Sequence, residues 1–256
     1  MSTLFDLSGK VAVAVGGNGV LGSSMAKGLA EHGAKVAIVG RNLAKAEEIV
    51  HEIIQNGGEA KAFFVDVLTK DSLLKAADEI EQWAGCWDIL LNAPGTNSAT
   101  PFFEIDMDEW DRIMDVNLKG IVLTCQIFAE KMIKHGKKGS IINISSVSST
   151  TPLSRVFTYS VSKAGLNSVT QFLAREFAPY EIRVNAIIPG FFPAEQNKKI
   201  LDQERIEDIM KHTPMKRFGE AEELQGTAVW LASDKASSFV TGALIRVDGG
   251  FGSMTI

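Results

Sequence analysis

The sequence is poor in cysteine, and this limits the chemistry that it can carry. It has only two cysteines, Cys86 and Cys125, and they do not form a C-x-x-C pattern. Neither a disulfide framework nor a structural zinc site is therefore predicted, and we expect no metal. Cys125 lies in the apolar run "IVLTCQIF" at 121–128 and is expected to be a packed core thiol rather than a nucleophile.

The sequence also lacks the features that direct a chain to a membrane or to nucleic acid. It has no apolar run of about 18 residues, and its first residues, "MSTLFDLSGK", lack the basic and then apolar order of a signal peptide. Its net charge is −5, from 26 basic and 31 acidic residues, so no basic surplus attracts a phosphate backbone. We therefore expect a cytoplasmic protein whose partners include neither a membrane nor nucleic acid.

What the sequence has in abundance is alternation between short apolar runs and longer segments of helical period. No linker or low-complexity tract interrupts the 256 residues, of which 45% are hydrophobic, so one domain over 1–256 is predicted. Nearly all-apolar strands between helices indicate an α/β fold, a doubly wound seven-stranded parallel sheet with helices on both faces. The expected strands are 10–15, 35–40, 60–66, 88–92, 139–145, 182–188 and 243–248, and the expected helices are 19–32, 42–56, 70–84, 108–135, 158–178 and 220–233.

One stretch, 190–218, departs from this alternation because it is long and mixed and follows the sixth strand. Open α/β sheets bind their ligands at the carboxyl ends of the strands. We therefore expect this stretch to contribute to a substrate site.

A glycine-rich turn, "GGNGVLG" at 16–22, joins the first strand to the first helix. Such a turn lets the backbone approach a pyrophosphate, and the helix N-terminus that follows favours an anion. The glycines fit two spacings, G-x-G-x-x-G from Gly17 and G-x-x-x-G-x-G from Gly16, the second with Val20 in place of its middle glycine. Dinucleotide binding is predicted, and the alternative is that the glycines merely close a tight turn.

The end of the second strand bears on the choice of cofactor. Dinucleotide folds usually have an acidic residue here for the adenosine ribose, whereas this sequence has Gly40 followed by Arg41. A guanidinium can pair with a 2′-phosphate, which favours NADP(H) over NAD(H). The alternative is that Arg41 is an exposed residue that simply precedes a helix.

Three residues form a candidate catalytic set. Tyr159 and Lys163 are four apart on a segment of helical period and so project from one face, and Ser146 follows the fifth strand. Reduction of a ketone creates an alkoxide, so an acid must supply a proton. A tyrosine hydroxyl can do so, and a nearby lysine ammonium is expected to stabilise the phenolate and lower the tyrosine pKa.

These residues, together with the glycine turn, resemble the short-chain dehydrogenase/reductase family over essentially the whole chain. Further matches in order are Asp66-Val67, "NAPG" at 92–95, Asn117 in "DVNLKG", Pro189-Gly190 and "VDGG" at 247–250. The resemblance implies a Rossmann fold, an NAD(P)(H) cofactor and a homotetramer with helices 108–135 and 158–178 at an interface. It also favours the frame of Gly16, position 20 and Gly22 for the glycine turn.

The resemblance implies a role for each matched residue. Tyr159 would be the general acid/base, Lys163 would tune it and hold the nicotinamide ribose, Ser146 would bind the substrate carbonyl, and Asn117 would position a water that links Lys163 to solvent. The alternatives are that Ser146 caps a turn, that Asn117 satisfies a backbone group and that Asp66 caps the helix at 69–84. The residues expected to contact the cofactor are Gly16, Asn18, Val20, Leu21, Gly22, Arg41, Asp66, Val67, Asn92, Ala93, Gly95, Tyr159, Lys163, Pro189 and Gly190.

The sequence departs from the family pattern at four positions. Val15 and Val20 replace a usual threonine and glycine, Pro94 removes a backbone N–H, and Ala194 stands where many members have a threonine that holds the nicotinamide carboxamide. A β-branched residue at position 20 needs a negative φ and limits the approach of the backbone to a pyrophosphate. These departures concern cofactor affinity more than catalysis.

The loops above the strand ends are polar and favour a polyhydroxylated substrate. The runs "PGFFPAEQN" and "HTPMKRFGEAEEL" are similar to the branch of D-mannonate oxidoreductases (fructuronate reductases), near the gluconate 5-dehydrogenases. Hydride transfer between NAD(P)(H) and a keto-sugar acid is therefore expected. The alternatives are reduction of another carbonyl, such as a 3-oxoacyl thioester or small ketone, and a non-catalytic dinucleotide-binding scaffold.

Arg155 is a candidate carboxylate clamp by position, or else an exposed loop arginine. The candidate substrate residues are Asn97, Ser146, Arg155, Glu195, Gln196 and Asn197.

Overall fold

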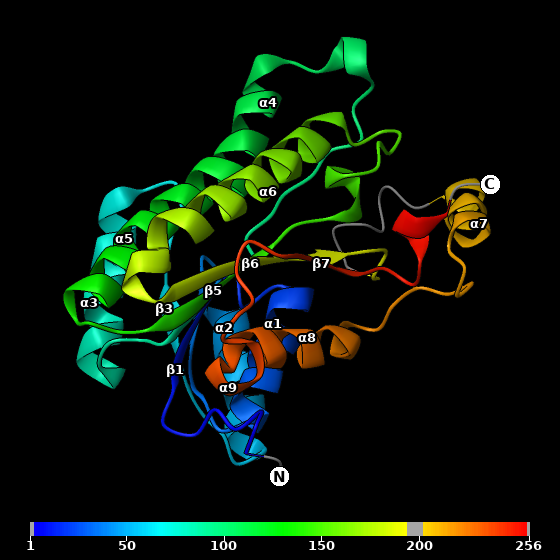
Figure 1. Ribbon diagram of the computed structural model, residues 1–256. Helices are drawn as coiled ribbons and strands as arrows, with labels where there is room; N and C mark the ends of the chain where they lie inside the picture. Colours follow the sequence, from blue (N-terminus) through cyan, green and yellow to red (C-terminus); the bar gives the residue numbers. More distant parts are fainter. Residues whose placement is uncertain (1–2, 194–201, 255–256) are drawn as a thin grey trace.

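Seven parallel strands form one sheet in the order β3-β2-β1-β4-β5-β6-β7 (Figure 1). The structure is a computed structural model that describes residues 3–193 and 202–254. The predicted seven-stranded parallel sheet is confirmed. Its strands are β1 Val11–Val15, β2 Lys35–Gly40, β3 Glu59–Phe64, β4 Ile89–Asn92, β5 Gly139–Ile144, β6 Ile182–Pro189 and β7 Leu244–Val247.

The central strands are buried on both faces, which explains their nearly uninterrupted apolar sequence. All five residues of β1 are buried, and Val13 pairs with Ala37 of β2 on one side and Leu90 of β4 on the other. The chain moves outward from β1 to β3 and then returns to β4 on the other side of β1. The strand order therefore reverses between β1 and β4, where an open α/β sheet forms a crevice at its carboxyl edge.

Helices cover both faces of the sheet, so the sheet forms the middle of three layers (Figure 1). The apolar side chains of each face form a separate core cluster with the helices packed on it. One face carries α1 Val20–Glu31, α2 Leu43–Gln55 and α8 Gln225–Ala232; the other carries α3 Lys70–Ala84, α5 Gly120–Lys134 and α6 Phe157–Phe177.

Two segments differ from the sequence-based expectation. The predicted helix 108–135 consists of α4 Met107–Met114, a π-helical turn Asp115–Lys119 and α5, and residues 203–212 of the mixed stretch form α7, Gln203–His212. A short helix, α9 Asp234–Ser237, follows α8. Among the described residues, no helix combines the length and the apolar character that crossing a membrane requires.

Candidate active site

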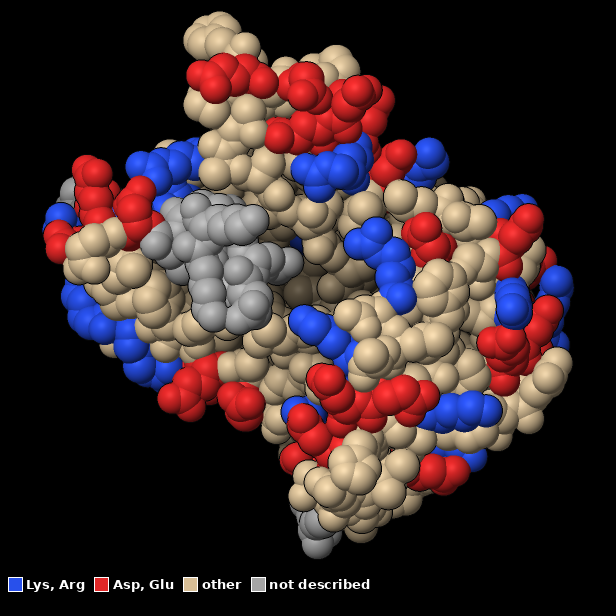
Figure 2. Space-filling model, turned by 180° about the vertical axis from the view of Figure 1, so that it is seen from behind, with Lys and Arg blue, Asp and Glu red and all other residues tan. Residues whose placement is uncertain are grey.

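A cavity of about 420 Å³ opens at the carboxyl edge of the sheet, where the strand order reverses. Figure 2 shows this hollow, with basic side chains near its rim. The cavity brings together residues from the whole length of the chain. The predicted site residues that line it are Gly16, Asn18, Val20, Leu21, Gly22, Arg41, Asp66, Val67, Ala93, Gly95, Asn97, Ser146, Tyr159, Lys163, Pro189 and Gly190.

The glycine turn packs so closely that three of its glycines, Gly16, Gly17 and Gly22, have no room for a side chain. Gly16 has a φ of +76°, and a Cβ there would lie 2.7 Å from the backbone nitrogen of Pro94. A Cβ on Gly22 would overlap the carbonyl oxygen of Gly16, whereas a Cβ on Gly19 would lie 3.4 Å from its nearest neighbour. The packing therefore excludes a side chain at Gly16, Gly17 and Gly22 and admits one at Gly19; the requirement at Gly16 and the freedom at Gly19 are those of the second spacing.

The N-terminus of α1 faces the cavity and is suited to an anion. Gly19 is the N-cap residue and provides no side-chain cap, and the first turn contains no acidic residue. The backbone N–H groups at a helix start lack intrahelical acceptors and, with the helix dipole, favour a phosphate. Val20 is the first residue of the helix and its side chain is exposed at the cavity wall, so it leaves these donors accessible.

The end of β2 presents two cations to the cavity. Arg41 lies just before α2, and Lys45, in the first turn of that helix, lines the same wall. The side chain of Asn18 lies over Gly40, where a Cβ would be 2.5 Å from its Oδ1, and donates to the carbonyl of Asn42 at 3.1 Å. Sequence reasoning missed Lys45, although its place in the first turn of the helix after β2 could have indicated it.

The side chain of Asn92, which was predicted to contact the cofactor, lies inside the sheet. Asn92 is fully buried and does not line the cavity; its Nδ2 donates to Asn143 Oδ1 at 2.9 Å and to the sulfur of Cys125 at 3.3 Å. The side chain is needed to pair another polar group inside the sheet. Burial raises the pKa of Cys125 to about 12, so the expectation of a core thiol is confirmed.

The adjacent residues of the cavity wall keep their expected places. Asp66 accepts a hydrogen bond from the backbone N–H of Leu68 at 3.1 Å and lines the cavity, while Thr69, not Asp66, is the N-cap residue of α3. Pro94 lines the cavity where it packs on Gly16. The four residues Ala194, Glu195, Gln196 and Asn197 lie outside the described residues.

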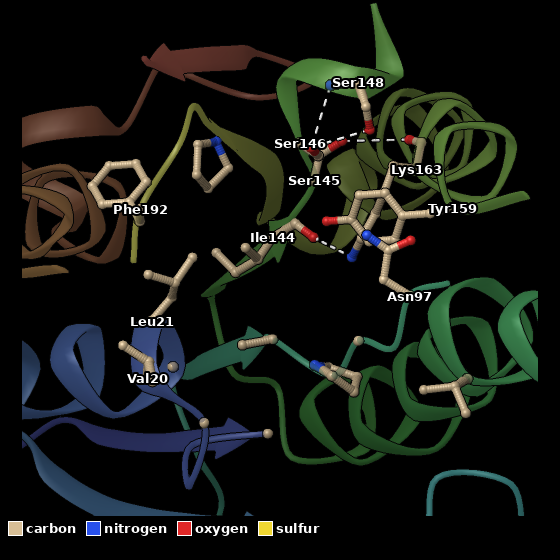
Figure 3. Close-up of a pocket in the computed structure, with 18 of the residues that line it drawn as sticks. Val20, Leu21, Asn97, Ile144, Ser145, Ser146, Ser148, Tyr159, Lys163 and Phe192 are labelled. Carbon is tan, nitrogen blue, oxygen red and sulfur yellow. Dashed lines mark hydrogen bonds between the residues drawn. The ribbon is translucent and has the colours of Figure 1, made fainter. Parts of the chain in front are cut away.

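Ser146, Tyr159 and Lys163 converge on one part of the cavity (Figure 3). Ser146 follows β5, and its Oγ accepts from the backbone N–H of Ser148 at 3.2 Å and from the Ser148 hydroxyl at 3.1 Å. Ser146 thus caps the short turn at 147–149 and also faces the cavity. Lys163 projects from α6 and its Nζ donates to the carbonyl of Ile144 at 2.8 Å.

Burial sets the protonation of the tyrosine and the lysine. Burial raises the pKa of Tyr159, and a hydrogen bond with Ser146 opposes this rise. Burial lowers the pKa of Lys163 to about 8. The expected lowering of the tyrosine pKa by Lys163 is not found, because the Lys163 Nζ lies 5.8 Å from the ring centroid and is bonded to Ile144. Tyr159 therefore keeps its proton at neutral pH.

Asn117 lies in the π-helical turn and holds the loop after β4. Its Oδ1 accepts from the backbone N–H of Thr96 at 2.8 Å, and its Nδ2 donates to the Thr96 carbonyl and to Ser162 Oγ. It is fully buried and does not line the cavity, so the alternative that it satisfies backbone groups is what the geometry shows. π-Helical turns often mark functional sites. Its bonds fix Gly95 beside Lys163.

Arg155 does not reach the cavity, so the structure contradicts its prediction as a substrate residue. It is exposed and its Nη1 pairs with Asp202 Oδ2 at 2.6 Å. The residue that lines the cavity instead is Arg205 of α7. Its position could not be read from the sequence because it depends on how α7 docks.

Comparison with known proteins identifies the family to which this geometry belongs. A family model described as enoyl-(acyl carrier protein) reductase matches residues 17–252. An uncharacterized oxidoreductase of Bacillus subtilis (strain 168), UxuB, is 40% identical, with 96% of each chain covered. The chain belongs to the short-chain dehydrogenase/reductase family. It is an oxidoreductase of that family.

Two solved structures of short-chain dehydrogenases/reductases resemble it throughout. One is a gluconate 5-dehydrogenase from Burkholderia cenocepacia J2315 in complex with NADP and tartrate, with a TM-score of 0.93, 35% identity and 98% of each chain covered. The other, from Haemophilus influenzae, is described as a candidate D-mannonate oxidoreductase with bound NAD; it has a TM-score of 0.92, 37% identity and coverage of 98% of this chain and 97% of that chain. Relatives with either dinucleotide thus share this fold.

Proposed function

We propose that the protein transfers a hydride between NADP(H) and a keto-sugar acid, with Tyr159 as the general acid/base. The observation that carries the proposal is the convergence of Ser146, Tyr159 and Lys163 in a cavity that also receives the N-terminus of α1. The glycine turn fits a dinucleotide because Gly16 and Gly22 pack without room for side chains and leave the helix start accessible. Reduced nicotinamide, when bound, supplies the hydride.

The residues of the site would then donate the proton and stabilise the developing charge. The substrate carbonyl oxygen accepts hydrogen bonds from the hydroxyls of Ser146 and Tyr159, and the phenol gives its proton as the alkoxide forms. The raised pKa of Tyr159 keeps the phenol protonated at neutral pH, which suits reduction. Lys163, whose pKa is about 8, is charged at neutral pH and stabilises the phenolate that is left.

Arg41 and Lys45 support the preference for NADP(H). Both line the cavity at the end of β2, where an adenosine ribose lies in dinucleotide folds. Two cations without a carboxylate at this strand end favour a 2′-phosphate over a free hydroxyl. The gluconate 5-dehydrogenase with NADP is consistent with this choice, and the relative with NAD makes NAD(H) the alternative.

Two features support a sugar acid as substrate. The wall near Tyr159 offers the polar groups of Asn97, Ser146 and Ser148, and the similar structures carry the names gluconate 5-dehydrogenase and D-mannonate oxidoreductase. The cavity is also lined by Leu153, Phe191 and Phe192, which favour an apolar carbonyl compound as the second candidate. A non-catalytic scaffold is the third, because Val20 and Pro94 remain unusual for the family.

The deciding experiment follows the loss of reduced-nicotinamide absorbance with NADH and NADPH separately. Fructuronate, 5-ketogluconate and an acetoacetyl thioester are the substrates, and Tyr159→Phe is the matched variant. We expect NADPH-dependent turnover of a keto-sugar acid, and a loss of about 10²–10⁴-fold in kcat in Tyr159→Phe with unchanged cofactor affinity. Turnover of the thioester alone would reject the sugar acid, and cofactor binding without any turnover would favour the scaffold.

We also propose that the chain forms a homotetramer through the layer of α5 and α6. Phe172 on α6 is 61% exposed in the single chain, and an aromatic side chain of this exposure suits an interface. Light scattering of the purified protein tests this assembly. The cytoplasmic location and the absence of a nucleic-acid partner stay predictions.

A further inference from the structure

The cations that line the cavity outnumber the acids. Among the described lining residues, the cations are Arg41, Lys45, Lys163 and Arg205, and the one carboxylate is Asp66. Arg41 and Lys45 lie at the β2 end, and Lys163 donates to the backbone of β5 beneath Tyr159. Arg205 alone among these four belongs neither to the β2 end nor to the catalytic set.

The Arg205 guanidinium is anchored at the wall that carries Tyr159. Its Nη1 donates to Ser154 Oγ at 3.0 Å and its Nη2 to the Ser154 carbonyl at 2.9 Å. Ser154 lies between Leu153 and Val156, which line the cavity, and five residues before Tyr159. These contacts place the cation of α7 beside the segment that leads into the catalytic helix.

Within the described residues, the guanidinium of Arg205 has no hydrogen-bonded carboxylate. Ser154 offers two neutral oxygens, and the described residues contain no ion-pair partner for Arg205. Asp202, on the same turn, pairs instead with Arg155 and accepts the backbone N–H of Arg205 at 2.8 Å. Burial, and then the charge of Arg155, lower the pKa of Arg205, and the charge of the nearby Asp202 partly opposes this.

We propose that Arg205 binds the carboxylate of an acid substrate and determines specificity for acids over neutral ketoses. The guanidinium has five N–H donors, of which the two bonds to Ser154 use two, so donors remain for a carboxylate. Arg155 is not available as the clamp, because Asp202 already pairs with its side chain. The inference rests on the proposed function, which it makes more specific.

The test compares a keto-sugar acid with a neutral ketose of the same length in the wild type, Arg205→Met, Arg205→Lys and Lys211→Met. We expect Arg205→Met to raise KM for the acid by about 10- to 100-fold and to leave KM for the ketose and the dissociation constant of NADPH unchanged. Arg205→Lys should restore part of the loss because it keeps the charge but not the planar fork. Lys211→Met, at an exposed cation of α7 that pairs with Asp208 and does not line the cavity, is the control and should behave as the wild type.

A binding measurement separates failure of this inference from failure of the proposed function. Calorimetry with the NADP-loaded wild type should show tighter binding of D-gluconate than of D-glucitol, and Arg205→Met should abolish the difference. Equal binding of the two by the wild type would overturn the inference, as would an unchanged KM for the acid in Arg205→Met. If no keto-sugar acid is reduced but gluconate still depends on Arg205, the carboxylate site stands and the proposed reaction falls.

Discussion

The two walls of the cavity are built in different ways. The wall at the α1 and β2 end is made from the ends of buried strands, and Gly16 and Gly22 pack there against backbone atoms. The opposite wall, made by 150–156 and α7, is held partly by exposed contacts such as Arg155 with Asp202. The comparison indicates that core packing fixes the first wall, whereas surface contacts position the second.

The two walls differ in how far a substitution disturbs the structure around it. A change at a close-packed backbone contact must move the strands that carry it, because interiors are dense and transmit strain. A change in an exposed ion pair is compensated by water and contributes little. We therefore expect substitutions of similar size to differ greatly in effect between the two walls.

The largest effect should follow a methyl group added to the α1 wall. Gly22→Ala would push a Cβ into the carbonyl oxygen of Gly16, so we expect cofactor affinity to fall by at least about 100-fold and the free energy of unfolding by about 1–3 kcal/mol. Fluorescence titration with NADPH and urea unfolding measure the two quantities. Gly19→Ala is the matched control, since its Cβ would meet ordinary contact distances. Equal behaviour of the two variants would contradict this account of the turn.

Substitution of the buried Lys163 should have an intermediate effect. Lys163 is 3% exposed, and its folded-state pKa of about 8 lies below the ordinary 10.5. Lys163→Met removes activity, but at neutral pH it should raise the free energy of unfolding by about 2 kcal/mol. This figure combines about 3 kcal/mol from the pKa difference with about 1 kcal/mol lost with the bond to Ile144.

The pH dependence of that difference has a defined sign. Between about pH 8 and pH 10.5 the unfolded lysine binds a proton that the folded lysine has lost, so the wild type gains stability as the pH rises. The advantage of Lys163→Met should therefore shrink across this window, as measured by urea unfolding at several pH values. Lys119→Met, at an exposed lysine paired with Asp115, is the control and should show no such change. If Lys163→Met were more stable than the wild type by the same amount at every pH, the pKa of Lys163 in the folded protein would not be lowered.

The smallest effect should follow a change at the surface near the second wall. Arg217 pairs with Glu223 at 2.6 Å, and both side chains are exposed. We expect Arg217→Met to shift the midpoint of thermal unfolding by less than about 2 °C. Scanning calorimetry of the variant beside the wild type is sufficient. A shift as large as that of Gly22→Ala would remove the distinction between the two walls.

Sequence reasoning predicted the first wall well for a physical reason. The strands are apolar because they are buried on both faces, and Gly16 and Gly22 are glycines because a backbone atom occupies the space of a side chain. Both constraints limit which residue type can stand at a position, and they leave a pattern within a few neighbouring residues. The same holds for the spacing of Tyr159 and Lys163 on one helix face.

The errors concern residues whose roles depend on contacts distant in the sequence. Asn92 was assigned to the cofactor, but its amide pairs with Asn143 of β5 inside the sheet. The break in the helix at 115–119 reflects the bonds of Asn117 to Thr96 and Ser162, which hydrophobic periodicity does not record. Arg205 was missed because its place depends on the docking of α7 against Ser154.

The turn at Arg155 has a consequence for how such enzymes diversify. Its backbone is left-handed, with a φ of +66°, and the adjacent residues Ser154 and Arg155 bind Arg205 and Asp202 of α7 respectively. One short peptide thus supplies contacts at the start of α7, while the buried Ile209 and the contact of His212 with Phe251 hold the rest of the helix. Changes in this peptide and at the start of α7 can therefore accumulate in evolution without disturbing the buried strand ends that carry the glycine turn.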